Sequence, residues 1–162
     1  MKQVLSLLLL LPFFASAQDS CQLKTSRDPY TKEVRISTGF ISLGSYKVSI
    51  DAVAKEIDIF FMLDGSKCVD DQTSVVINFE GGRQKQTLRN SGTMNCEGYV
   101  HVVFRNTPAT NSSLQRIANM KVSSIFFKKD KDETVVMLTA DQKLVFQKAV
   151  SCMITAAKGL IP

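Results

Sequence analysis

The chain has 162 residues, a net charge of +5 at neutral pH and a hydrophobic fraction of 44%. This length fits one domain, and the charge is too modest to indicate the concentrated basic stripe of a nucleic-acid-binding protein. After the N-terminus, no apolar run approaches the roughly 20 residues that a membrane-spanning helix needs. We therefore expect a globular domain with no stable membrane insertion and no nucleic-acid partner.

The N-terminus has the pattern of a secretory signal peptide. Lys2 precedes an apolar run from Val4 to Phe14, and Ala15-Ser16-Ala17 supplies small residues at both positions that a signal peptidase reads. We expect cleavage after Ala17, a single domain over 18–162, and export to the periplasm or the cell exterior. Removing residues 1–17 leaves 145 residues with a net charge of +4, because Lys2 is the only charged residue removed.

Most of the chain alternates apolar and polar residues, as strands do. After a turn at Asp28-Pro29-Tyr30-Thr31, we expect about eight or nine strands, in the segments 34–36, 40–43, 46–52, 55–63, 74–80, 83–88, 98–105, 121–128 and 133–138. The segment 55–63 gives the clearest pattern, since every second residue from Ile57 to Leu63 is apolar. Gly81-Gly82 predicts a two-residue hairpin, because glycine readily adopts the positive φ that such turns require.

Two segments follow a helical pattern instead. Ser112-Ser113-Leu114-Gln115 resembles a capping box at the start of a brief helix. Thr139 and Gln142 form a stronger capping box, and they predict a helix over about 140–158. Apolar and small residues recur along it at three- and four-residue steps and suggest one buried face, made of Val145, Ala149, Cys152, Met153 and Ala156.

These elements together predict a mainly β fold. We expect an antiparallel β-sandwich of about eight or nine strands with the C-terminal α-helix packed on it. Phe60 and Phe126 lie on the second face of their strands, where an apolar residue needs a cover. The C-terminal helix is the favoured cover, and a dimer interface on the same patch is the alternative.

Four cysteines follow the signal segment: Cys21, Cys68, Cys96 and Cys152. An even number in an exported protein predicts two disulfides. Three connectivities are open, and we favour Cys68–Cys96, across a hairpin-containing segment, with Cys21–Cys152, from the chain's start to its last helix. The scattered spacing and the single histidine do not fit a zinc site, so we expect no metal and no cofactor. A lipoprotein signal ending at Cys21 is disfavoured, because the residues just before it are polar.

No catalytic arrangement emerges from the sequence. His101 is the only histidine, and no nucleophile motif accompanies it. Asp64, Asp70 and Asp71 surround Cys68 and could serve acid–base chemistry, but a solvated, disulfide-tied loop is the simpler interpretation. Lys128, Lys129 and Asp130 begin a run of alternating charges typical of a hairpin tip. These six residues are the candidate interaction loops.

We therefore expect a non-catalytic binding module whose partner is a protein or a cell-surface glycan. An inhibitor of an extracellular enzyme, with a charged protruding loop, is one version of this hypothesis. The alternatives are a small hydrolase that uses carboxylates such as Asp70 and Asp71, and a structural subunit of the cell envelope that uses the Phe60 and Phe126 face or a sheet edge.

The chain also resembles small exported Gram-negative bacterial proteins of unknown function. The similar segments are the turn at Asp28-Pro29-Tyr30-Thr31, the Cys68 loop leading into Val75-Val76-Ile77-Asn78-Phe79-Glu80-Gly81-Gly82, the segment Asn95-Cys96-Glu97-Gly98-Tyr99, and the final helix with Cys152. The resemblance implies a β-sandwich-like fold, and it assigns neither an activity nor catalytic residues.

Overall fold

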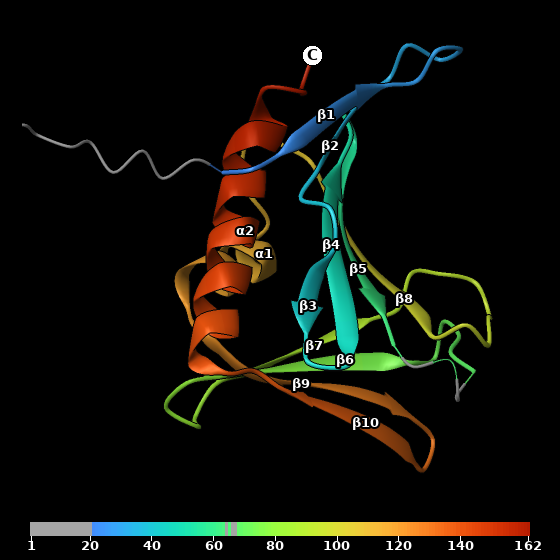
Figure 1. The fold of residues 1–162 in the computed structure, drawn as a ribbon, viewed down its shortest axis with the longest axis vertical. Helices are drawn as coiled ribbons and strands as arrows, with labels where there is room; N and C mark the ends of the chain where they lie inside the picture. Colours follow the sequence, from blue (N-terminus) through green and yellow to red (C-terminus); the bar gives the residue numbers. More distant parts are fainter. Residues whose placement is uncertain (1–20, 64, 66–67) are drawn as a thin grey trace, which may run out of the picture.

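The computed structural model describes residues 21–63, 65 and 68–162, which form two antiparallel sheets and two helices (Figure 1). The expected signal segment 1–17 and Asp64 lie outside the described residues. The larger sheet contains β1 (Lys24–Arg27), β2 (Val34–Ser37), β3 (Ile41–Leu43), β4 (Tyr46–Ala52), β5 (Glu56–Met62) and β8 (Tyr99–Arg105). The smaller sheet contains β6 (Ser74–Phe79), β7 (Lys85–Arg89), β9 (Val122–Lys129) and β10 (Asp132–Met137).

The larger sheet has the order β1-β2-β4-β5-β8, and β3 pairs with the part of β4 that does not pair with β2. β5, which lies between β4 and β8, confirms the alternation read from the sequence, because Ile57, Ile59 and Phe61 are buried on one face. β1 was not expected, and its sequence KTSR is exposed throughout. It pairs with β2 through a turn in which the Asp28 carboxylate accepts the backbone N–H groups of Tyr30 and Thr31, at 2.8 and 2.7 Å.

The smaller sheet has the order β10-β9-β6-β7, and in Figure 1 its strands cross those of the larger sheet rather than running alongside them. The hairpin between β6 and β7 forms where Gly81 and Gly82 predict it, and both glycines have positive φ. Its loop is longer than two residues, because the last ladder bond runs from the Phe79 N–H to the Gln84 carbonyl. The two sheets meet in the core, where the Phe61 and Phe127 rings lie 5.2 Å apart.

The C-terminal helix α2 (Ala140–Lys158) has the predicted boundaries and capping box. The Gln142 N–H donates to the Thr139 hydroxyl, and the Gln142 side chain accepts the Thr139 N–H. Only Met153 of the predicted buried face is buried, and the rest of that prediction was wrong, since the other buried residues are Phe146, Val150 and Ala157. A second stripe of small and apolar residues runs along the helix, displaced by about one residue from the buried stripe. Periodicity alone does not decide which of the two stripes faces the core.

Helix α2 packs against β2, β3 and β4 of the larger sheet and against β9 of the smaller sheet. It therefore covers the side of the sheets that faces the core. We expect α2 to cover Phe60, but it does not. The Phe60 ring contacts the rings of Phe40, Tyr99 and His101 instead, with centroids 4.8 to 6.2 Å away. Phe126 lies beneath the ammonium of Lys128, 5.3 Å from the ring centroid. Both aromatic residues therefore lie on outer sheet faces, shielded by local side chains.

The short helix α1 (Ser112–Asn119) forms where a brief helix was expected, and it packs against α2. Its N-cap is Asn111 rather than Ser112, because the Asn111 side chain accepts the Ser113 N–H at 2.9 Å. Leu114 and Ile117 bury its apolar side in the common core. The main hydrophobic cluster thus draws on both sheets and both helices.

Candidate interaction surface

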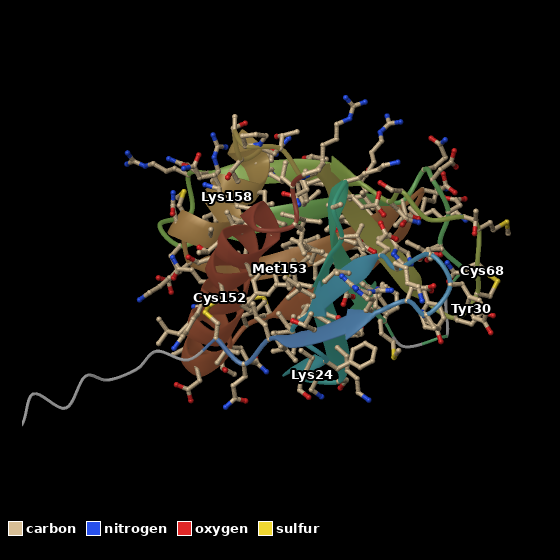
Figure 2. The ribbon with its side chains drawn as sticks, turned by 90° about the horizontal axis from the view of Figure 1, so that it is seen from above. Lys24, Tyr30, Cys68, Cys152, Met153 and Lys158 are labelled. Carbon is tan, nitrogen blue, oxygen red and sulfur yellow. A yellow bond between two sulfur atoms is a disulfide. The ribbon has the colours of Figure 1, made fainter. Side chains whose placement is uncertain are left out.

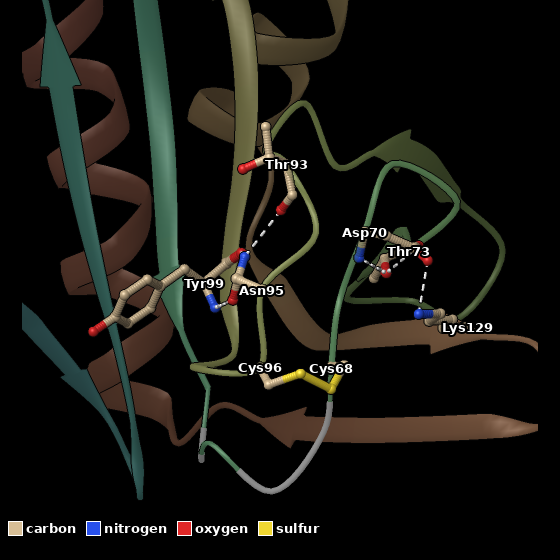
Figure 3. The surroundings of a disulfide bond; sticks show 8 residues. All are labelled: Cys68, Asp70, Thr73, Thr93, Asn95, Cys96, Tyr99 and Lys129. Atoms are coloured by element: carbon tan, nitrogen blue, oxygen red, sulfur yellow. Dashed lines mark hydrogen bonds and ion pairs between the residues drawn. A yellow bond between two sulfur atoms is a disulfide. The ribbon is translucent and has the colours of Figure 1, made fainter.

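Three segments that are distant in the sequence meet at one end of the molecule. They are residues 68–73, which follow β5, residues 93–98, which precede β8, and residues 129–132, at the β9–β10 hairpin; we call them together the loop cluster. The Cys68–Cys96 disulfide joins the first two, as Figure 3 shows. Paired backbone bonds between Val69 and Asn95, at 2.8 and 2.9 Å, hold them side by side.

Asn95 organises the middle segment through its side-chain amide. Its Nδ2 donates to the carbonyls of Thr93 and Tyr99 at 3.1 and 2.9 Å, and its Oδ1 accepts the Tyr99 N–H at 2.9 Å (Figure 3). Gly98 completes the turn with a φ of +74°, and a Cβ there would lie 3.0 Å from the Leu63 carbonyl oxygen. A side chain at this position would crowd Leu63, the residue after β5, and would require a positive φ that only glycine adopts readily.

Asp70 links the first segment to the hairpin. Its carboxylate forms an ion pair with the Lys129 ammonium at 2.7 Å and accepts the Gln72 N–H at 3.0 Å. The hydrogen bond from Lys129 is the largest cause of a lowered pKa for Asp70, and it outweighs partial burial, which acts in the opposite direction. The carboxylate is therefore charged at neutral pH and holds the hairpin against the Cys68 segment.

Buried polar residues support the cluster from beneath. The Asn90 Nδ2 donates to the Asp70 carbonyl at 2.8 Å, while the Asn90 Oδ1 accepts the N–H of His101 on β8 at 2.8 Å. Asn90 and Thr73 are almost completely buried, so these bonds form away from competing water. They connect the irregular loops to the regular strands and fix their position relative to the sheets.

The cluster carries exposed charged and apolar side chains. Asp71, Glu97 and Asp130 are exposed acids, Lys131 is an exposed base, and the Met94 side chain is 70% exposed. The cavity beneath, lined partly by Cys68, Phe127 and Lys129, measures only about 30 Å³. Such a space holds no more than a water molecule, so this cavity is too small for a substrate.

The structure brings together only some of the residues proposed from the sequence. Asp70 and Lys129 are in direct contact, and Asp71 and Asp130 lie on the same loops. Lys128 points to the outer face of the smaller sheet, where it pairs with Glu133. The segment around Asn95 and Met94 was not proposed as a site, although Cys96, as the expected disulfide partner of Cys68, was the signal that could have placed it there.

The contacts of His101 are structural. Its Nδ1 lies 2.7 Å from the Asp58 carboxylate, and its ring packs on Phe60. On the same outer face Arg35 pairs with Asp51 at 3.3 Å, and the Ser49 hydroxyl donates to that carboxylate. Since Asp51 and Asp58 are direct cross-strand neighbours, Arg35 and His101 each place a basic group beside one of two adjacent acids.

The second disulfide, Cys21–Cys152, and the first are the two pairs that the sequence favours, and such bonds are typical of oxidising compartments. In the part of the chain that the structure describes, no group of three or more His, Cys, Asp or Glu side chains could hold a metal ion. None of the helices in residues 21–63, 65 and 68–162 is both long and apolar enough to cross a bilayer. No protein family, curated protein or solved structure matches this chain.

Proposed function

We propose that this chain is an exported, non-catalytic binding module that contacts a protein partner through the loop cluster. The observation that carries the proposal is the joint bracing of three distant segments by the Cys68–Cys96 disulfide and the Asp70–Lys129 ion pair. Loops fixed in this way lose little conformational entropy when a partner binds, which favours affinity. Export rests on the N-terminal signal pattern and agrees with the two disulfides.

A protein suits this surface better than a glycan. Met94 offers a flexible apolar anchor, and methionine is enriched at protein interfaces. Glycan sites favour a flat, open aromatic ring, whereas the Tyr99 ring next to the cluster packs edge-on against Phe60. The exposed acids Asp71, Glu97 and Asp130 favour a partner with a basic rim around an apolar pocket. An inhibitor of an extracellular enzyme is one such module.

The hydrolase alternative receives less support from this geometry. A general acid near neutral pH needs a raised pKa, and the pKa of Asp70 is lowered. Asp71 is exposed and lies outside any enclosed cleft formed by the described residues of the cluster. The envelope-subunit alternative would use the outer sheet faces, so it predicts self-association that substitutions in the loop cluster leave intact.

A capture experiment with a matched control tests the proposal. Immobilised protein 18–162 is exposed to the extracellular and envelope fractions of its host, beside the double variant Asp71→Lys/Asp130→Lys. The control, Glu33→Lys/Glu56→Lys, makes the same charge change at exposed positions outside the cluster. We expect a saturable protein partner that the cluster variant loses by at least about tenfold and the control retains. Equal capture by both variants, or no saturable partner, would overturn the proposal.

A further inference from the structure

Helix α2 has two stripes of small and apolar residues, and only one of them is used by the core. Phe146, Val150 and Met153 of the first stripe are fully buried. The second stripe, with Val145 and Ala149, lies beside the core-facing stripe on the surface of the helix, and Val145 is 49% exposed. Exposed apolar side chains are common on their own, but these residues form one wall of a groove.

The groove has a volume of about 370 Å³, within the range of about 300–1,000 Å³ that small-molecule sites occupy. One wall is the second stripe of α2, and the other is built from Leu23, Phe40 and Ile41, near β1 and β3. The Cys21–Cys152 disulfide contributes to the lining and ties the two walls together. In Figure 2 the described chain starts beside Cys152 of α2 and runs on to Lys24.

The groove is basic as well as apolar. Lys148 is one of the described residues that line it, and none of those described residues is acidic. The Lys24 ammonium lies at its edge, because a Cβ on Gly39 would sit 4.0 Å from the Lys24 Nζ, and the neighbours of Gly39, Thr38 and Phe40, line the groove. Within residues 21–63, 65 and 68–162 no carboxylate forms an ion pair with Lys24. An apolar trough with cations beside it suits a ligand with an apolar body and an anionic head.

We propose that this groove binds a single-chain anionic amphiphile of the fatty-acid class. The acyl chain lies between Val145 and Ala149 on one side and Leu23, Phe40 and Ile41 on the other, while the carboxylate faces Lys24. Each methylene that leaves water adds to the binding free energy, and the ammonium favours the anionic head over a cationic one. This site is separate from the loop cluster, so a test that overturns this proposal leaves the proposed function unaffected, and the reverse is also true.

A single chain fits the groove better than a bilayer does. A membrane surface contacts protruding apolar and basic residues, whereas three of the apolar side chains that line this trough, Leu23, Ile41 and Ala149, are partly buried, and a planar surface would reach only the more exposed Phe40 and Val145. The Val145 side of the helix lies beside the groove and is open to solvent, so one chain can enter from that side. The proposal therefore commits to the monomeric amphiphile.

Calorimetric titration of the protein 18–162 with dodecanoate, below its micelle concentration, tests the site. We expect saturable binding that Val145→Asp weakens by at least about tenfold, since it places a carboxylate on the apolar wall. Lys24→Glu should weaken it by roughly fivefold or more. The matched controls, Val135→Asp on the exposed edge strand β10 and Lys85→Glu on β7, should bind as the unmodified protein does.

Two further probes separate the head group and the source of the amphiphile. Dodecyltrimethylammonium has the same chain with a cationic head, and it should bind at least about tenfold more weakly than dodecanoate. Anionic phosphatidylglycerol vesicles should not retain the protein. Absence of saturable dodecanoate binding, equal binding of both heads, equal loss in the control variants, or binding to vesicles alone would each overturn the proposal.

Discussion

The helix side and the loop cluster are each tied by one disulfide, yet they hold their structure by different means. On the helix side, Phe146, Val150 and Met153 are fully buried, and apolar burial fixes the position of α2. In the loop cluster, an ion pair, side-chain amides and a short disulfide-closed loop fix residues that remain largely at the surface. Stability is thus concentrated in one region, and the exposed side chains of the proposed contact surface, such as Asp71 and Met94, can change at little cost to folding.

The two disulfides allow the strongest test of this comparison. Cys21–Cys152 closes a separation of 131 residues and Cys68–Cys96 one of 28. In the chain-entropy model their removal costs about 5 and about 3.5 kcal/mol, because the longer loop restricts the unfolded chain more. Urea unfolding of the paired cysteine-to-alanine variants under oxidising conditions measures both values. A larger loss from the Cys68→Ala/Cys96→Ala variant would contradict the concentration of stability on the helix side.

Truncating the core stripe of α2 should have the next largest effect. Phe146→Ala removes a fully buried ring, so we expect a loss of about 3–5 kcal/mol in the free energy of unfolding. Leu144→Ala, two residues away on the same helix at a 51% exposed position, should change it by less than about 0.5 kcal/mol. Denaturant titration of both variants gives the contrast, and similar losses would show that we have assigned the buried face incorrectly.

The smallest effect concerns the ion pair of the loop cluster. The pKa of Asp70 is lower in the folded chain than in the unfolded chain, so the pair stabilises the fold fully above the ordinary value of about 3.9. That contribution is lost as the pH falls through the lowered folded-state value. In Lys129→Met the pKa of Asp70 should rise towards its ordinary value, as carbon-detected NMR of the carboxyl group can measure.

Asp28 provides an internal control for that titration. The backbone N–H groups of Thr31 and Tyr30 lower the pKa of its carboxyl, and Lys129 is not among the causes. The Lys129→Met substitution should therefore leave the Asp28 titration unchanged while it moves that of Asp70. An unmoved Asp70 would mean that the hairpin is held by something other than this ion pair.

The sequence predicts best those elements whose signal is local. The capping residues Thr139 and Gln142 predict where α2 begins, and the alternation of Ile57, Ile59 and Phe61 predicts the buried face of β5. β1 was missed because its four residues are polar and exposed, and only its pairing with β2 makes it a strand. The loop cluster was predicted as two separate loops, because the Asp70–Lys129 contact spans 59 residues and leaves no periodic pattern.

The same limit explains the error over α2. Val145 and Phe146 begin two neighbouring stripes, and a helix of fixed period accommodates either as its buried face. The choice depends on the size of the side chains that fill the space between the sheets, where the large Phe146 ring and Met153 fit. The fit of side-chain sizes is a property of the tertiary structure. The stripe that begins with Val145, which the core does not use, forms one wall of the proposed groove.

The Cys21–Cys152 bond has a consequence for how the chain matures. In a chain exported N-terminus first, Cys21 and Cys68 are the first two thiols to reach the oxidising side, and the native structure does not pair them with each other. An oxidant that joins thiols in order of arrival would produce a wrong crosslink, which must be reshuffled by thiol–disulfide exchange. In an exported chain Cys21 would receive its partner only after the last helix had crossed, so formation of the Cys21–Cys152 bond would report translocation up to that helix.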